Sequence, residues 1–165
     1  MSISRHWRTC SSAVRDSFVH LAFALLALVV CGAAEELLPK FSGAGFPLLL
    51  AVSQLVAARW RTAEAVLFAL AAGALEDSVS NLPMMTSASF YLLVSLPVKW
   101  TGFPAVATIL SYPIYHLWLA LWAPLPDGGT WQRVLAAVPI ACVTAYAAST
   151  VFSWAQRKAA VGEQD

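Results

Sequence analysis

Six apolar segments separated by short polar connections take up most of this chain. The segments are Asp16–Ala34, Gly43–Ala58, Thr62–Leu75, Pro83–Val98, Phe103–Ala123 and Gln132–Trp154. About 20 helical residues span the ~30 Å hydrocarbon core of a membrane, so the first, fifth and sixth segments are long enough alone. The shorter segments need flanking residues or a locally thinned bilayer. The pattern predicts an all-α integral membrane protein, a six-transmembrane helix bundle with short loops; five spans and a re-entrant hairpin remain an alternative.

The composition indicates lipid as the solvent of this bundle. Hydrophobic residues make up 59% of the chain and charged residues 12%, whereas about a quarter of the residues in a soluble domain are charged. The net charge is +1 and no block of Lys or Arg occurs. We therefore expect the lipid bilayer, and no nucleic acid, as a partner.

The charges between the segments alternate in sign and predict the orientation of the helices. With six spans, eight of the ten Lys and Arg residues fall on one side of the membrane, which leaves Lys40 and Arg133 on the other. Because positive charge marks the cytoplasmic side, we expect both termini in the cytoplasm. Residues 1–15 would form a basic segment, 16–155 the transmembrane domain and 156–165 a tail.

Two helix faces are built from small residues at a spacing of four. One face holds Ala65, Ala69, Gly73 and Asp77, and the other holds Ala137, Ala141, Ala145 and Ser149. Residues at this spacing stack on one side of a helix, and small side chains there let a neighbouring helix approach closely. Both faces are predicted to pack against other helices, and the spacing leaves open whether those belong to this chain or to a partner.

The acidic residues Glu76 and Asp77 end the third segment, where the helix dipole disfavours negative charge. A capping role or a partner is therefore expected for them. The polar residues that follow are Ser78, Ser80 and Asn81. One of these, or Asp77 itself, could cap exposed N–H groups at the start of the fourth helix, and Pro83 suits the first turn of that helix. The alternative is that Asp77 anchors a polar group of a partner.

The sequence predicts no enzyme, no metal site and no cofactor. An aspartate dyad needs two acids that converge from different elements. Here Asp16 lies on the side opposite to Asp77, and Asp127 lies in a Pro/Gly turn. No His/Glu pair has the spacing of a zinc site. A hydrogen bond to Tyr112, one helical turn away, is the simplest role for His116.

Glu35, Glu36 and Lys40 faintly resemble the EExxxR pattern of the CPBP family of intramembrane glutamate proteases, with Lys40 in place of the arginine. A lysine cannot make the bidentate contact of an arginine. That family also needs several histidines on later helices, and this chain offers His116. We therefore expect a solvated acidic loop here.

Residues 65–96 resemble MreD, the rod shape-determining membrane protein family. In that family the third helix ends in a glycine and an aspartate, matched here by Gly73 and Asp77, and a turn with a proline follows, matched by Pro83. The family has glycine soon after the proline, where this chain has Met84 and Met85. Glycine permits backbone conformations there that methionine adopts less readily.

The resemblance implies a non-enzymatic scaffold of the machinery that elongates the bacterial cell wall. Such a protein would lie in the plasma (inner) membrane with the single-span protein MreC. Together they would link the cytoplasmic MreB filament to the RodA glycosyltransferase and its partner, a class B penicillin-binding transpeptidase. The small-residue faces would serve internal packing or the docking of MreC, with Asp77 as the polar anchor.

The strongest alternative is a substrate-binding (S) component of an energy-coupling-factor vitamin transporter, whose fold MreD is expected to resemble. An S component holds its vitamin in an outer cavity. The residues that could line such a cavity here are Glu76, Asp77, Asn81, Tyr115, His116 and Trp122. A sealed bundle would favour the scaffold, whereas an outward-open pocket of about 300 Å3 or more around Asp77 and His116 would favour transport.

Overall fold

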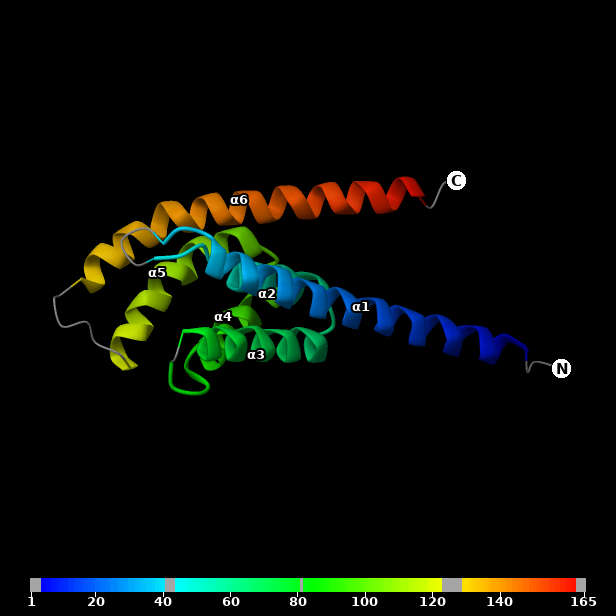
Figure 1. The fold of residues 1–165 in the computed structure, drawn as a ribbon. Helices are drawn as coiled ribbons and strands as arrows, with labels where there is room; N and C mark the ends of the chain where they lie inside the picture. The colour runs from blue at the N-terminus through cyan, green and yellow to red at the C-terminus, as the bar shows by residue number, and fades with distance from the viewer. Residues whose placement is uncertain (1–3, 41–43, 81, 123–128, 163–165) are drawn as a thin grey trace.

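The described part of the chain folds into six α-helices (Figure 1). A computed structural model describes residues 4–40, 44–80, 82–122 and 129–162. The helices are α1 (Ser4–Leu37), α2 (Leu48–Arg59), α3 (Thr62–Val79), α4 (Thr86–Thr101), α5 (Pro104–Trp122) and α6 (Thr130–Gly162). Each helix overlaps one predicted apolar segment, but the ends differ: α1 begins earlier, α2 and α4 begin later, and α3 and α6 end later than the apolar patterns do.

Among the described helices, two are long and apolar enough to cross a membrane. They are α5 and the Thr130–Val151 part of α6, and 28% of each is buried inside the protein. By contrast, α2 is apolar but has 12 residues, α4 has 16 residues, and α3 carries three acidic side chains. The predicted number of helices is therefore found, whereas length and composition of the described residues support two spans rather than six.

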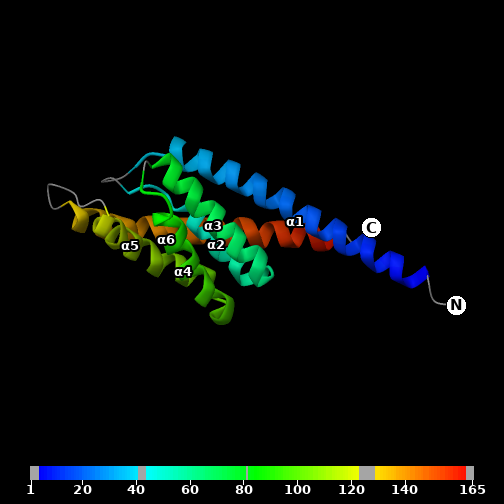
Figure 2. The same ribbon diagram turned by 90° about the horizontal axis from the view of Figure 1, so that it is seen from below.

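The short helix α2 lies at the centre of the bundle and contacts each of the other five helices (Figure 2). Its residues Leu49, Leu50 and Val56 are buried, and so are the polar residues Ser53 and Gln54. A helix that is apolar around its whole circumference belongs in a core rather than on a surface. The position of α2 follows from this composition.

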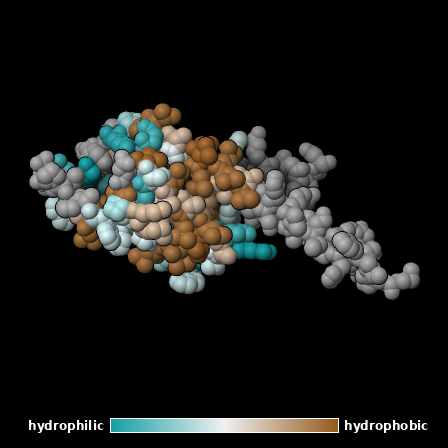
Figure 3. Space-filling view, turned by 60° about the horizontal axis from the view of Figure 1, so that its bottom comes forward, coloured by the Kyte–Doolittle hydropathy of each residue, from teal (hydrophilic) through white to brown (hydrophobic). Residues whose placement is uncertain are grey.

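Large hydrophobic side chains cover the outer faces of the peripheral helices. On α5 the exposed residues Val106, Leu110, Ile114, Leu117 and Leu121 recur at helical spacing. Further exposed Leu and Val side chains occur on α1 and α6. Figure 3 shows hydrophobic residues gathered over the middle of one face. An apolar exterior of this extent needs lipid or a partner to cover it.

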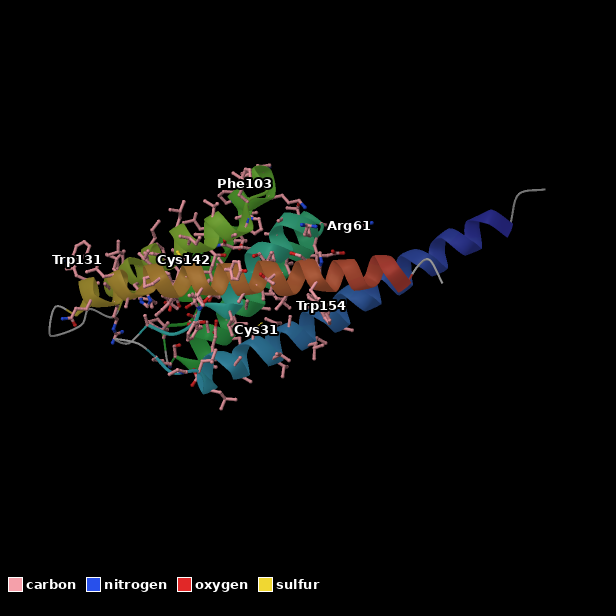
Figure 4. All side chains as sticks on the ribbon, turned by 90° about the horizontal axis from the view of Figure 1, so that it is seen from above. Cys31, Arg61, Phe103, Trp131, Cys142 and Trp154 are labelled. Carbon is pink, nitrogen blue, oxygen red and sulfur yellow. The ribbon has the colours of Figure 1, made fainter. Side chains whose placement is uncertain are left out.

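The two ends of the bundle carry different residues. Both chain termini extend from one end, and α1, α3 and α5 finish at the opposite end, which we call the distal end (Figure 1). Trp131 of α6 lies at the distal end, whereas Arg61 and Trp154 lie toward the termini (Figure 4). Near the terminal end, Lys99 of α4 donates a hydrogen bond to the carbonyl of Trp60.

The small-residue face of α3 is internal and packs against α4. Ala65, Ala69 and Gly73 are all buried. A Cβ atom added at Gly73 would lie 2.7 Å from the carbonyl carbon of Ser87, and closer still to the N and Cα atoms of Ala88. The glycine therefore allows the backbones of α3 and α4 to meet.

The small-residue face of α6 is internal as well. Ala137, Ala141 and Ala145 are buried and Ser149 is partly buried. Ala145 and Ser149 lie beside residues of α2 and α5. Both faces thus pack within the chain, which answers the question that the spacing left open.

Candidate ligand cavity

The carboxylate of Asp77 caps the N-terminus of α4. Its Oδ1 atom accepts a hydrogen bond of 2.7 Å from the backbone N–H of Ser87, in the first turn of that helix. Asp77 is buried, and its negative charge lies at the positive end of the α4 dipole. The bond satisfies an N–H group that a helix start otherwise leaves unpaired. The hypothesis that Asp77 caps the fourth helix is confirmed.

The turn before α4 differs from the prediction. The sequence predicts Pro83 in the first helical turn, but α4 begins at Thr86, whose N–H donates to the Pro83 carbonyl at 3.1 Å. Between them, Met85 has a φ of 72°. This left-handed conformation costs a non-glycine residue about 1–2 kcal/mol. Because Met85 occupies it, the helix cannot extend back to the proline.

Two hydrogen bonds attach α5 to the same first turn of α4. The hydroxyl groups of Ser87 and Tyr115 are 2.5 Å apart. The indole N–H of Trp118 donates to the carbonyl of Thr86 at 3.0 Å. The junction of α3 and α4 therefore also fixes the part of α5 that carries Tyr115 and His116.

Glu35, at the end of α1, caps α2 in the way that Asp77 caps α4. Its Oε1 atom accepts a hydrogen bond of 2.7 Å from the N–H of Leu49. No side chain at the N-cap residue of α2, Pro47, supplies this contact. The prediction of a solvated acidic loop is wrong for Glu35, because the first turn of a buried helix recruits it. It holds for Glu36, which is exposed and lies 3.7 Å from the ammonium group of Lys40.

Glu35 and Glu76 bring two carboxyl groups from different helices together. The two groups are hydrogen-bonded to each other, and the Tyr91 hydroxyl donates to Glu76 Oε2 at 3.2 Å. Burial raises the pKa of Glu35 to about 9, and the charge of Glu76 adds to this effect. Burial also raises the pKa of Glu76. Two adjacent carboxylates resist simultaneous ionisation, so the pair holds a proton at neutral pH.

A cavity of about 490 Å3 lies beside this pair at the distal end. The ionisable residues in its wall, besides three tyrosines, are Glu35, Glu36, Lys40, Glu76, His116 and Arg133. They come from α1, α3, α5, α6 and the connection after α1. Since Glu36 and Lys40 line the cavity and are exposed, the cavity reaches the surface of the bundle beside this ion pair. Its volume is within the range of small-molecule sites.

His116 and Arg133 provide basic groups in the wall of the cavity. His116 is 7% exposed, and its Nε2 atom has no hydrogen-bond partner among the described residues. Arg133 is close enough to act electrostatically on the imidazole. The predicted hydrogen bond between His116 and Tyr112 is not formed. The Tyr112 hydroxyl donates to the carbonyl of Gly45 at 2.5 Å, and its ring contacts the imidazole edge-on.

The cavity includes half of the residues that the sequence suggested for it, namely Glu76, Tyr115 and His116. Asp77 faces α4 and does not line the cavity. Trp122 is exposed and lies outside the cavity wall. Asn81 lies outside the described residues.

The polar wall residues that sequence reasoning missed include Glu35, Tyr91, Tyr112 and Arg133. One signal could have found the site. Lys40 and Arg133 are the two bases that depart from the predicted charge distribution, and both line this cavity beside its acidic residues. Basic residues on the side of the membrane that the positive-inside rule disfavours can indicate a site where acidic groups are nearby.

A second polar group, in the middle of the bundle, was also missed. The fully buried Gln54 of α2 donates from Nε2 to Ser111 Oγ at 2.8 Å and accepts from Thr108 Oγ1 at 3.2 Å. Interhelical hydrogen bonds of this kind are each worth about 0.6 kcal/mol inside membranes. They fix the register of α2 against α5, and so position Tyr112 and Tyr115 at the cavity.

The chemistry of the cavity favours binding of a polar molecule. Within the described ranges, no three His, Cys, Asp or Glu side chains are grouped so that they could hold a metal ion. The acid pair of this cavity consists of two glutamates, which also accept hydrogen bonds from the N–H of Leu49 and the hydroxyl of Tyr91. Such a pair can keep its proton or exchange it for a cationic group.

Comparison of the chain with family models, curated proteins and solved structures finds no match. The resemblance to MreD therefore rests on residues 65–96 of the sequence alone.

Proposed function

We propose that the chain is a multi-pass protein of the bacterial plasma membrane, with all six helices within the bilayer and both termini in the cytoplasm. Two observations support this. The exteriors of α5 and α6 are apolar over lengths that cross a bilayer. In addition, Arg61 and Lys99 lie near the terminal end, where the rule of positive charge predicts the cytoplasm. The shorter helices α2 and α4 reach both faces where the bilayer thins around them.

Within that membrane the chain acts as a non-enzymatic scaffold of the cell-wall elongation machinery, as the MreD resemblance implies. The junction of α3 and α4 carries this proposal. Both residues behind the resemblance have structural roles there, because Gly73 admits the backbone of α4 and Asp77 caps it. Met85 adopts a left-handed conformation in the turn where the family has glycine.

MreC is the direct partner in this proposal, and MreB, RodA and the class B transpeptidase are reached through it. The two small-residue faces are filled by this chain's own helices. The transmembrane helix of MreC therefore meets an outer, apolar face of the bundle rather than Gly73 or Asp77.

Depletion of the chain from its native cells tests the scaffold. The expected result is a change from rods to spheres, with wall synthesis no longer distributed along the cylinder, and rescue by the wild-type gene. Cells that keep their shape and their wall-synthesis pattern after full depletion would contradict the scaffold.

A second candidate function, the S component of a vitamin transporter, is favoured by the cavity of about 490 Å3. This volume exceeds the roughly 300 Å3 expected of a small-molecule site. The cavity reaches His116, although Asp77 lies outside it. An S-component-like fold is expected for both functions, so the presence of a cavity does not distinguish them. The partners of the chain and the molecule bound in the cavity do. Co-purification of an ATPase pair with a shared coupling subunit, and vitamin uptake that depends on this chain, would establish the second function in place of the first.

A further inference from the structure

The acidic side of the cavity is suited to an ammonium group. The Glu35–Glu76 pair presents carboxyl oxygens at the wall, and the Tyr91 and Tyr115 rings flank it. A carboxylate offers strong charge-assisted hydrogen bonds to an ammonium donor.

The basic side of the cavity is suited to an oxyanion. The Nε2 atom of His116 is buried and has no partner among the described residues. A buried polar atom without a hydrogen bond destabilises the structure, so a ligand that supplies the partner is bound more tightly. The guanidinium of Arg133 is positioned in the same wall and can make a paired contact with a phosphate or carboxylate.

The charges of the wall balance for a molecule that carries both groups. Glu36 and Lys40 compensate each other at the rim. The remaining ionisable groups that face the cavity from α1, α3, α5 and α6 are Glu35, Glu76, His116 and Arg133. With one shared proton the acid pair carries a single negative charge and can pair with one cation, while Arg133 carries one positive charge and can pair with one anion. A ligand with a single charge would leave one side unpaired.

We propose that this cavity binds a small zwitterion, whose ammonium group contacts Glu35 and Glu76 and whose oxyanion contacts Arg133 and His116. The cavity opens at the distal end of the bundle, where both a dissolved zwitterion and the head group of a phosphatidylethanolamine lipid can reach it. The two sources share the same recognition chemistry. This inference deepens the second candidate function and is independent of the scaffold, because binding is measured on the purified chain and scaffolding in cells.

Calorimetric titration of the purified full-length chain in detergent at pH 7 tests the proposal with O-phosphoethanolamine. Ethanolamine and ethyl phosphate, which each retain one of its two charged groups, are the controls. We expect phosphoethanolamine to bind at least about tenfold more tightly than either control.

Three variants localise the binding. Glu76→Gln removes one carboxylate and Arg133→Gln removes the guanidinium, and each should weaken binding by about tenfold or more. Arg61→Gln removes a charge at the terminal end of the bundle and should bind as the wild type does. Circular dichroism and gel filtration establish that each variant is folded before it is titrated.

A second titration, with dihexanoyl phosphatidylethanolamine, distinguishes the two sources. Binding of the lipid alone, lost in Glu76→Gln and Arg133→Gln, supports the zwitterion site and identifies a head group as its occupant. Binding of phosphoethanolamine identifies a dissolved ligand. The proposal is overturned if neither compound binds, if the single-charge controls bind equally well, or if the two cavity variants bind as Arg61→Gln does.

Discussion

Gly73 lies directly against the backbone of Ala88, so that α3 and α4 touch without a side chain between them. This contact joins the end of one helix to the first turn of the next. Asp77, one turn further along α3, caps α4 on the same side. The geometry of the distal end depends on this pair of contacts, because Glu76 and Tyr115 are both held by them.

Substitution of Gly73 tests the contact. We expect Gly73→Ala to destabilise the folded chain by about 1–3 kcal/mol, because the added methyl group meets backbone atoms that cannot rotate away. Gly73→Leu should prevent folding. The measurement is thermal unfolding in detergent, and Ala74→Leu, on the exposed side of the same helix, is the control. Equal stability of Gly73→Leu and Ala74→Leu would contradict the contact.

The stabilising effect of Asp77 should come mainly from the hydrogen bond that its Oδ1 atom accepts from the Ser87 N–H, rather than from its negative charge alone. We expect Asp77→Ala to cost about 0.5–2 kcal/mol, the usual effect of a lost cap. Asp77→Asn keeps an acceptor for the Ser87 N–H and should retain most of that stability. Thermal unfolding of both variants gives the comparison. If Asn and Ala destabilise equally, the cap is not the source of the effect.

Met85 offers a stabilising substitution. With φ at 72°, it occupies a conformation that glycine adopts without strain. We expect Met85→Gly to raise the stability by about 1 kcal/mol. Met84→Gly is the matched control, because Met84 is exposed but has no positive φ, and it should give no gain. A loss of stability in Met85→Gly would show that the methionine side chain, rather than its backbone, matters.

These residues show how far the sequence leads. The spacing of Gly73 and Asp77 predicts a face of a helix, but it does not identify the helix that covers the face. The capping role of Asp77 follows from its place before a new helix, whereas Glu35 reaches α2 across a connection whose path the sequence does not give. The cavity could not be predicted, because Glu35, Glu76 and Arg133 belong to three different helices.

The acid pair predicts a dependence of stability on pH. Glu35 has a pKa of about 9 in the folded chain, against 4.5 for an unperturbed glutamate. A raised pKa stabilises the fold below the unfolded value, and that contribution is lost as pH rises toward 9. We therefore expect the melting temperature to fall between pH 5 and pH 9.

Two variants isolate the origin of that pH dependence. Glu76→Gln removes the neighbouring charge and should make the profile less steep, although burial remains as the main cause that raises the pKa of Glu35. Glu36→Gln, at the exposed pair with Lys40, should leave the shape of the profile unchanged. A profile that is equally steep in Glu76→Gln would exclude the pair as its cause.

The most direct test of the central claim is purification of the tagged chain from its native membrane in mild detergent, followed by mass spectrometry of the proteins that accompany it. If the chain is the elongation scaffold, MreC, a single-span protein, should be recovered with RodA and a class B penicillin-binding transpeptidase. Recovery of an ATPase pair with a coupling subunit, and without the wall-synthesis proteins, would contradict the scaffold and assign the chain to transport.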